Sequence, residues 1–171
     1  MTIVLLGYMA SGKTAVSKLL GTALELPVVD LDDYIEQKER KSIPEIFETK
    51  GEIYFRKKEH QYLKEVLEMQ EPKVVSLGGG TPCYANNMKL IHEYTTDTFY
   101  LRTSIKEIIN RVKDEKSKRP LISTISDEDL PEFIGKHLFE RNAFYQQATH
   151  SILTDHKTVE EIVVEIKQLL N

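Results

Sequence analysis

The feature that most restricts the fold of this chain is the eight-residue run Gly7–Thr14, Gly-Tyr-Met-Ala-Ser-Gly-Lys-Thr. It matches the pattern G-x-x-x-x-G-K-[ST] and follows an apolar run at Thr2–Leu6, while helical spacing of apolar residues starts at Val16. Glycines in such a loop let backbone N–H groups and the N-terminus of the next helix face one anion. The run therefore predicts a phosphate-binding loop between a strand and a helix; the alternative is an ordinary glycine turn.

Apolar runs alternate with helical patterns along the remaining chain. The further runs are Val28-Val29, Val74–Leu77, Thr98–Leu101 and Ser151–Leu153. Apolar residues at helical spacing occur within 16–24, 55–67, 105–112 and 159–170. Continuous apolar runs are typical of strands buried on both faces, and their alternation with helices favours a parallel sheet. We expect an α/β protein with three α/β/α layers in one domain spanning residues 1–171.

Composition narrows the classes of partner. The 23 basic residues stand against 27 acidic ones, a net charge of −4, so the chain lacks the basic face that a nucleic-acid groove needs. Cys83 is the single cysteine, which excludes an internal disulfide and a cysteine zinc site. The first apolar run stops at Gly7, far short of a membrane span, and no basic segment precedes it. We expect a soluble, cytoplasmic protein that binds neither membrane nor nucleic acid.

Three carboxylates follow the second apolar run, at Asp30, Asp32 and Asp33. The carboxyl ends of parallel strands form the ligand-binding edge of open α/β sheets. Phosphoryl transfer needs a magnesium ligand and a group that orients or deprotonates the attacking hydroxyl, and Asp30 and Asp32 can divide these tasks. The alternative is that one of the three only caps the helix expected near Tyr34, and we expect Asp33 to be this cap.

The run Val74–Leu77 leads directly into Gly78-Gly79-Gly80. The absence of side chains indicates that a ligand or another backbone approaches closely; the alternative is a flexible, hairpin-like turn. Many proteins with this phosphate loop carry an acidic magnesium residue on the corresponding strand, where this chain has Ser76. That difference shifts the expected metal contacts to Thr14 and Asp30.

The polar segment 114–129 contains Pro120 and has no sustained period, which predicts a long loop, either an active-site lid or a surface insertion. Arg119 lies in this loop, whereas Arg56 and Arg141 lie in segments expected to be helical. Guanidinium groups suit carboxylates and phosphates, although a lone arginine on a charged helix is more often a solvated surface residue. Cys83 has no activating pattern around it and is interpreted as structural.

In combination, these motifs resemble the shikimate kinase family. The matching elements are the glycine loop, Asp30-x-Asp32, Gly51-Glu52-x-x-Phe55-Arg56, Gly78-Gly79-Gly80, Arg119-Pro120-Leu121 and Arg141, in the family's order and approximate spacing. The resemblance runs from about Ile3 to Tyr145. It implies a P-loop kinase that transfers the γ-phosphate of ATP to the 3-hydroxyl of shikimate in aromatic amino acid biosynthesis. It also implies magnesium as cofactor, a substrate-binding helical segment at about 31–62 and a mobile lid at about 114–129.

On the substrate side, the resemblance implies that Asp32 binds the shikimate hydroxyls and acts as the base. Arg56 and Arg141 would clamp the carboxylate, and Gly78 and Gly79 would form the wall of the substrate site.

On the nucleotide side, the resemblance implies that Lys13 and Arg119 act on the transferring phosphate, while Thr14 and Asp30 hold magnesium. Arg111 corresponds to a residue that packs on adenine. The implied ATP-binding residues are Gly7, Ala10, Ser11, Gly12, Lys13, Thr14, Ala15, Arg111 and Arg119. Ala10 stands where the family usually has glycine, and we expect little consequence because the motif permits variation there. The family's adenine-loop pattern near the C-terminus is not clear in Thr154–Lys157, so these residues are not assigned. We also expect the protein to be a monomer.

Other functions remain open alternatives. A gluconate or nucleoside monophosphate kinase has a similar fold, but a monophosphate kinase must recognise a base, whereas Arg56 and Arg141 with Asp32 suit a small hydroxy acid. A GTPase switch would be expected to show Asn-Lys-x-Asp or Thr-Lys-x-Asp, and neither occurs. An inactive homologue is disfavoured because every proposed chemical position is occupied.

Overall fold

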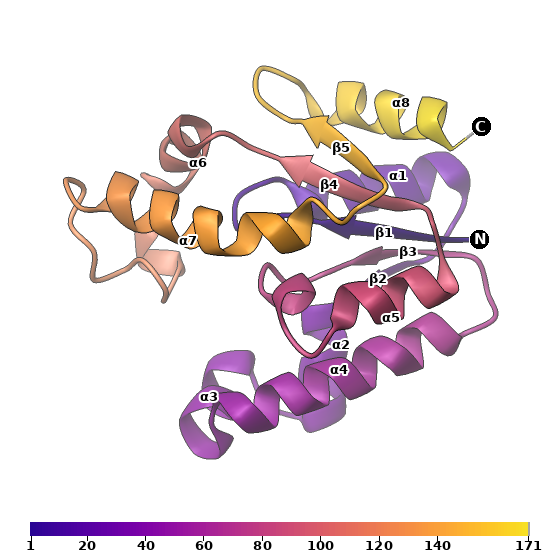
Figure 1. The fold of residues 1–171 in the computed structure, drawn as a ribbon, viewed down its shortest axis with the longest axis horizontal. Helices are drawn as coiled ribbons and strands as arrows, with labels where there is room; N and C mark the ends of the chain where they lie inside the picture. Colours follow the sequence, from indigo (N-terminus) through magenta and orange to yellow (C-terminus); the bar gives the residue numbers. More distant parts are fainter. Residues whose placement is uncertain (171) are drawn as a thin grey trace.

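Five parallel strands form the centre of the computed structural model, which describes residues 1–170 (Figure 1). The sheet has the order β2-β3-β1-β4-β5, and every neighbouring pair is parallel. The strands are β1 (Thr2–Leu6), β2 (Val28–Asp30), β3 (Lys73–Ser76), β4 (Thr98–Arg102) and β5 (His150–Leu153). Each of the five apolar runs is thus a strand, as predicted.

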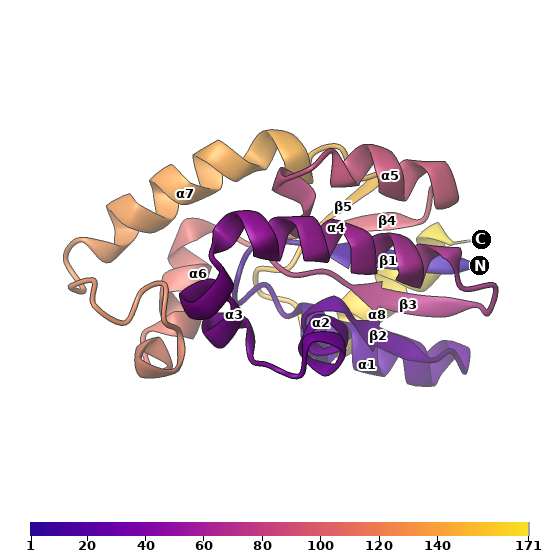
Figure 2. The ribbon, with the colours of Figure 1, turned by 90° about the horizontal axis from the view of Figure 1, so that it is seen from below.

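Helices cover both faces of this sheet, so the predicted three-layer α/β/α architecture is confirmed (Figures 1 and 2). They are α1 (Lys13–Leu24), α2 (Leu31–Glu39), α3 (Ile43–Lys50), α4 (Glu52–Glu68), α5 (Asn87–Tyr94), α6 (Ile105–Val112), α7 (Leu130–Tyr145) and α8 (Val159–Leu169). Alternate residues of β1 separate the layers: Ile3 and Leu5 join a core with α1 and α8, whereas Val4 and Leu6 join the core on the other face. The four helical patterns correspond to α1, α4, α6 and α8.

The start of α2 corrects one prediction. Asp33 is not the cap: α2 begins at Leu31, and the carboxylate of Asp30 accepts a hydrogen bond from the Asp33 N–H at 3.2 Å. Asp30 has extended backbone at the end of β2, which is the conformation that an N-cap residue needs. Asp33 therefore lies in the first turn of the helix, exposed to solvent.

The segment 114–129 joins α6 to α7 and contains only a short 3-10 helix, η2 (Lys116–Lys118), which confirms a long loop. Figures 1 and 2 place it at the carboxyl ends of the strands, opposite the N-terminus. Ile122 of this loop is fully buried in the core, and within the loop Lys116 forms an ion pair with Asp127 at 3.2 Å. Over residues 1–170, no helix is long and apolar enough to cross a membrane.

Candidate active site

The loop Gly7–Thr14 connects β1 to α1 and has the conformation that its glycines predict. A Cβ on Gly7 would lie 2.8 Å from the Leu101 carbonyl oxygen and 2.9 Å from Ser11 Oγ, so only glycine fits there without a shift. Gly12 caps α1 with a φ of 91°, in the left-handed region that glycine enters without strain. The loop thereby directs the N-terminus of α1 into a cavity, which is favourable for an anion.

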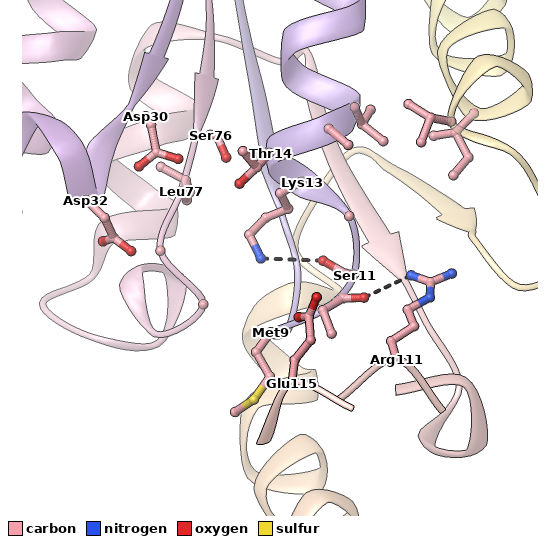
Figure 3. A pocket seen from close by; sticks show the side chains of 18 of the residues that line it. Met9, Ser11, Lys13, Thr14, Asp30, Asp32, Ser76, Leu77, Arg111 and Glu115 are labelled. Carbon is pink, nitrogen blue, oxygen red and sulfur yellow. Dashed lines mark hydrogen bonds between the residues drawn. The ribbon is translucent and has the colours of Figure 1, made fainter. Parts of the chain in front are cut away.

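Ala10 also has a left-handed backbone, with a φ of 60°. Its carbonyl oxygen accepts a hydrogen bond from Arg111 Nη1 at 2.9 Å, while Arg111 Nε donates to Glu107 Oε1 at 3.0 Å (Figure 3). Arg111 on α6 thus holds the phosphate loop at the residue where a side chain makes the conformation unfavourable. The same arginine lines the cavity, as its predicted place near the nucleotide requires.

The cavity beside the loop has a volume of about 800 Å³ (Figure 3). Its lining residues are Met9, Ala10, Ser11, Gly12, Lys13, Thr14, Ala15, Val16, Asp30, Asp32, Ser76, Leu77, Gly78, Gly79, Arg111, Glu115, Arg119, Lys157, Val159 and Ile162. Most sequence-predicted site residues are therefore together. Gly7, Arg56 and Arg141 are not among the lining residues; Arg141 lies beside Gly79, which lines the cavity, and Arg56 lies beside the next residue, Gly80.

Lys13 is held by the backbone of its own loop. Its ammonium group donates to the carbonyl oxygens of Gly7 and Tyr8 at 2.7 and 3.0 Å, and to Ser11 Oγ at 3.4 Å (Figure 3). Burial lowers the pKa of Lys13 to about 8, although the carboxylates of Asp32 and Asp30 act in the opposite direction. The group therefore supplies a positive charge at neutral pH next to the helix N-terminus.

Asp32 stands across the cavity from Lys13 (Figure 3). Burial raises the pKa of its carboxyl from 3.8 to about 6, and the nearby carboxylates of Asp30 and Glu59 add to this effect, whereas Lys13 opposes it. Such a group is mainly ionised at pH 7 and still basic enough to accept a proton. This is the behaviour expected of a general base.

The possible cation ligands lie at the ends of β2 and β3 and at the start of α1. Asp30 and Ser76 are register partners, and both line the cavity with Thr14. Burial raises the pKa of Asp30, whose Oδ1 also caps α2. No group of three His, Cys, Asp or Glu side chains suited to a metal occurs in the described residues 1–170. A hydroxyl and one or two carboxylates nevertheless fit magnesium, which takes its other ligands from water and substrate phosphates.

Side chains approach two of the three glycines after β3 closely. A Cβ on Gly78 would lie 2.7 Å from Asp32 Oδ1 and one on Gly80 would lie 2.8 Å from an Arg56 nitrogen, whereas one on Gly79 would lie 3.4 Å from Arg141 Nη1, an ordinary contact. The close approach predicted for this segment thus occurs at Gly78 and Gly80, where the neighbours are side chains rather than another backbone. The hairpin alternative is wrong, because β3 lies between two parallel strands.

Arg56 on α4 is not a solvated surface arginine. Its Nη1 donates to Glu59 Oε1 at 2.8 Å, and its guanidinium lies 3.9 Å from the centre of the Tyr84 ring. Glu59 is only 1% exposed and accepts a second hydrogen bond, from Thr81 Oγ1, at 2.9 Å. Sequence reasoning missed Glu59, although its position three residues after Arg56 on one helix was an available signal.

Arg141 on α7 is likewise partly buried. Its guanidinium lies 5.9 Å from the centre of the Tyr8 ring, at the start of the phosphate loop. Together with its position beside Gly79, this contact places Arg141 between the phosphate loop and the glycine segment. The structure therefore brings the two arginines and Asp32 to one short segment, Gly78–Gly80, from three different helices.

Arg119 reaches the cavity from the loop between α6 and α7. Its Nη2 donates to Glu115 Oε2 at 3.1 Å, and its Nε is buried without a hydrogen-bond partner in the described structure. The charge of Arg119 acts on Lys13, because it contributes to lowering the pKa of that amine. Two cations therefore meet in the cavity, which favours a highly charged anion between them.

The far end of the cavity is formed by residues that sequence reasoning left unassigned. Val159 and Ile162 on α8 and Lys157 before it line this end. The Lys157 ammonium donates to Glu165 Oε2 at 2.6 Å. The capping box of Thr158 and Glu161 marks the start of α8 in the sequence, and it was the available signal for this wall. Cys83 is partly buried, and burial raises the pKa of its thiol to about 11, as suits a structural residue.

Comparison with known proteins gives consistent matches. Residues 9–171 match the family model described as shikimate kinase. The shikimate kinase of Flavobacterium johnsoniae is 46% identical over 168 residues, which cover 98% of each chain. A crystal structure of shikimate kinase from Bacteroides thetaiotaomicron superposes with a TM-score of 0.91 at 34% identity, covering 99% of this chain and 98% of the other.

Two further solved structures resemble this chain to different degrees. A shikimate kinase from Acinetobacter baumannii in complex with shikimate has a TM-score of 0.87 and 30% identity, covering 99% of this chain and 92% of the other. A gluconokinase from Sinorhizobium meliloti has a TM-score of 0.61 and 18% identity, covering 98% of this chain and 92% of the other. The likeness to the gluconokinase shows a shared fold alone.

Proposed function

The chain belongs to the shikimate kinase family, and we propose that the cavity beside its phosphate loop is the site where ATP phosphorylates shikimate. The protein is an ATP-dependent phosphotransferase of the shikimate pathway. The observation that carries the assignment of the site is the meeting of Asp32, Arg56 and Arg141 at the three glycines after β3. A carboxylate base and two guanidinium groups match an acceptor that carries hydroxyls and a carboxylate.

In this proposal, Asp32 orients the 3-hydroxyl of shikimate and accepts its proton as the hydroxyl oxygen attacks the γ-phosphorus of ATP. The bond from the γ-phosphorus to the bridging oxygen of ADP breaks in the same transfer. The pKa of Asp32, near 6, supports this role, because the carboxylate is ionised at pH 7 before the reaction. Gly78 and Gly79 form the wall against which shikimate lies.

Arg56 and Arg141 bind the shikimate carboxylate in pairs of charge-assisted hydrogen bonds. The contact of Arg56 with Glu59 supports this role, since a guanidinium that is already held in place loses little freedom when the substrate binds. Arg141 is supported by its place beside Gly79 and the Tyr8 ring.

The nucleotide occupies the other side of the cavity. The backbone from Gly7 to Ala15 cradles the phosphates, and Lys13 and Arg119 stabilise the charge on the transferring group from two sides. Arg111 flanks the adenine ring of ATP, which extends toward Val159 at the start of α8. The loop 114–129 acts as the lid, and 31–62 as the substrate-binding helical segment of a single domain.

Thr14 and Asp30 hold magnesium in this proposal. Magnesium bound there with ATP neutralises charge on the phosphates and orients them for transfer. Asp30 can combine this role with its cap of α2, because a carboxylate has two oxygen atoms with several lone pairs. We further propose that the protein is a monomer in the cytoplasm. Size-exclusion chromatography with light scattering tests the oligomeric state, and cell fractionation tests the location.

A panel assay tests the proposed function. ATP consumption is followed with shikimate, gluconate and nucleoside monophosphates as acceptors, with and without magnesium. We expect efficient ATP consumption only when shikimate is the acceptor and magnesium is present. Equal turnover with gluconate would show that the arginines and Asp32 do not select a cyclic hydroxy acid.

A further inference from the structure

One face of α7 carries three polar side chains at four-residue spacing, His137, Arg141 and Tyr145. His137 Nδ1 and the Tyr8 hydroxyl are 2.9 Å apart, which connects α7 to the phosphate loop. Arg141 lies one turn further along, beside Gly79. Tyr145, at the end of the helix, donates a hydrogen bond from its hydroxyl to the Gly79 carbonyl oxygen at 2.6 Å. The face therefore joins the phosphate loop to the glycine segment.

Tyr145 is placed to act on the backbone of this segment. Its side chain is fully buried, and its ring packs on Tyr100 with 5.1 Å between ring centres. Burial raises the pKa of the Tyr145 hydroxyl, although Arg141 opposes the rise, so the group stays protonated and can donate. The residue that receives this bond is 66 positions away in the chain.

The backbone that receives this bond is a glycine turn in which the two neighbouring carbonyls are already held: Gly78 O accepts from the Thr81 N–H at 3.1 Å and Gly80 O from the Cys83 N–H at 2.9 Å. Three successive glycines have no Cβ atoms to restrict their dihedral angles. A hydrogen bond to the Gly79 carbonyl sets the plane of the peptide that joins Gly79 to Gly80. Because a trans peptide points its N–H away from its carbonyl, the bond also sets the direction of the Gly80 N–H.

We propose that Tyr145 is a positioning residue for shikimate: its hydroxyl holds the Gly79 peptide in the orientation that the substrate wall requires, next to Arg141. This inference rests on the proposed function, because it takes Gly79 and Arg141 to be the groups that touch shikimate. A merely structural tyrosine would stabilise the fold without distinguishing between the two substrates. Loss of a positioning residue weakens shikimate binding and leaves the affinity for ATP unchanged.

The variant Tyr145→Phe tests this inference, because it removes one oxygen atom and keeps the ring on Tyr100. The control is Tyr94→Phe, which removes another tyrosine hydroxyl, one that lies on α5 outside the segment 31–62 and donates to Glu68 Oε1 at 3.3 Å. Steady-state kinetics are measured with each substrate varied in turn, at a temperature where circular dichroism shows both variants folded. Calorimetric titrations at low temperature give the two binding constants independently.

For Tyr145→Phe, we expect the KM and Kd for shikimate to rise roughly three- to tenfold, the effect of one neutral hydrogen bond. The KM for ATP should stay within about twofold, and kcat within about threefold, since the wall binds ground state and transition state alike. Tyr94→Phe should change neither KM. Normal shikimate binding by Tyr145→Phe, an equal rise in both KM values, or failure to fold at any temperature would each overturn the inference.

Arg141→Ala, measured in parallel, separates this inference from the proposed function. If Arg141→Ala leaves the shikimate KM unchanged, the carboxylate clamp is wrong, whatever Tyr145→Phe does. If Arg141→Ala weakens shikimate binding and Tyr145→Phe does not, the clamp stands and the positioning role fails.

Discussion

Replacing Asp32 by Asn should stop the reaction and stabilise the protein. The substitution removes a charge and keeps the shape of the side chain. As the proposed base, Asp32 contributes a factor of about 10² to 10⁴ to phosphoryl transfer, and the amide cannot replace it. The stability gain has a different origin, because the carboxylate is ionised in a buried place that disfavours its charge.

The rise of the Asp32 pKa from 3.8 to about 6 gives the magnitude. Two pKa units correspond to about 3 kcal/mol of differential stability between the protonated and ionised forms. Because the folded-state pKa is raised, the penalty is absent below pH 4, grows as the pH rises, and is complete above pH 6 to 7. The pKa of about 6 already includes the attraction between Lys13 and Asp32, which lowers it, so this attraction adds no further contribution to the 3 kcal/mol.

Urea unfolding of parent and variant at about pH 5 and about pH 7.5 measures this effect. At the higher pH we expect Asp32→Asn to be more stable by about 2 to 3 kcal/mol, and at the lower pH by about half as much. The control is Asp33→Asn, the exposed neighbour in the first turn of α2. It should lose about 0.3 to 1 kcal/mol, because it gives up a favourable charge near a helix N-terminus.

The same variant is assayed for phosphoryl transfer by single-turnover kinetics with saturating ATP and shikimate. For the parent, steady-state rates at subsaturating shikimate give kcat/KM, which should fall about tenfold for each pH unit below 6, as Asp32 becomes protonated. A gain in stability that is equal at both pH values would refute the argument from burial. Near-normal turnover in folded Asp32→Asn would remove Asp32 from the mechanism.

Four further substitutions test other parts of the site. Arg119→Ala should slow the chemical step in single-turnover experiments more than it weakens shikimate binding; an unchanged transfer rate would contradict its role on the phosphate. Arg56→Ala and Arg141→Ala should each weaken shikimate binding by about 2 to 5 kcal/mol in calorimetry and leave ATP binding unchanged. The same substitutions should weaken the binding of a neutral carboxamide analogue of shikimate much less. If the parent protein binds this analogue as well as it binds shikimate, the carboxylate clamp is refuted. Gly80→Ala would place a Cβ 2.8 Å from an Arg56 nitrogen, so the guanidinium should shift from its place beside Glu59. The shikimate KM should rise and the thermal stability should fall; unchanged KM would show that the arginine position is not critical.

Local sequence patterns were sufficient for the architecture and for the position of the phosphate loop between β1 and α1. Continuous apolar runs identify the five strands because both faces of this sheet are covered by helices. The loop Gly7–Thr14 is equally local, since its glycines, its lysine and the helix that follows lie within a few residues of one another. Helices α3 and α5 were not recognised, because their apolar residues gather on one side less clearly than those of the equally short α6.

The substrate side depended on contacts between distant parts of the chain. Arg56 and Arg141 resemble ordinary surface arginines along the sequence, and it is the packing of α4 and α7 that brings both to the glycines after β3. Asp30 rather than Asp33 caps α2, because the backbone at the end of β2 sets the position of the cap. Tyr145 reaches Gly79 across 66 residues, and no spacing rule connects them. Periodicity reports how each segment divides its surface between core and solvent, whereas a site made by several helices exists only once the sheet has placed them.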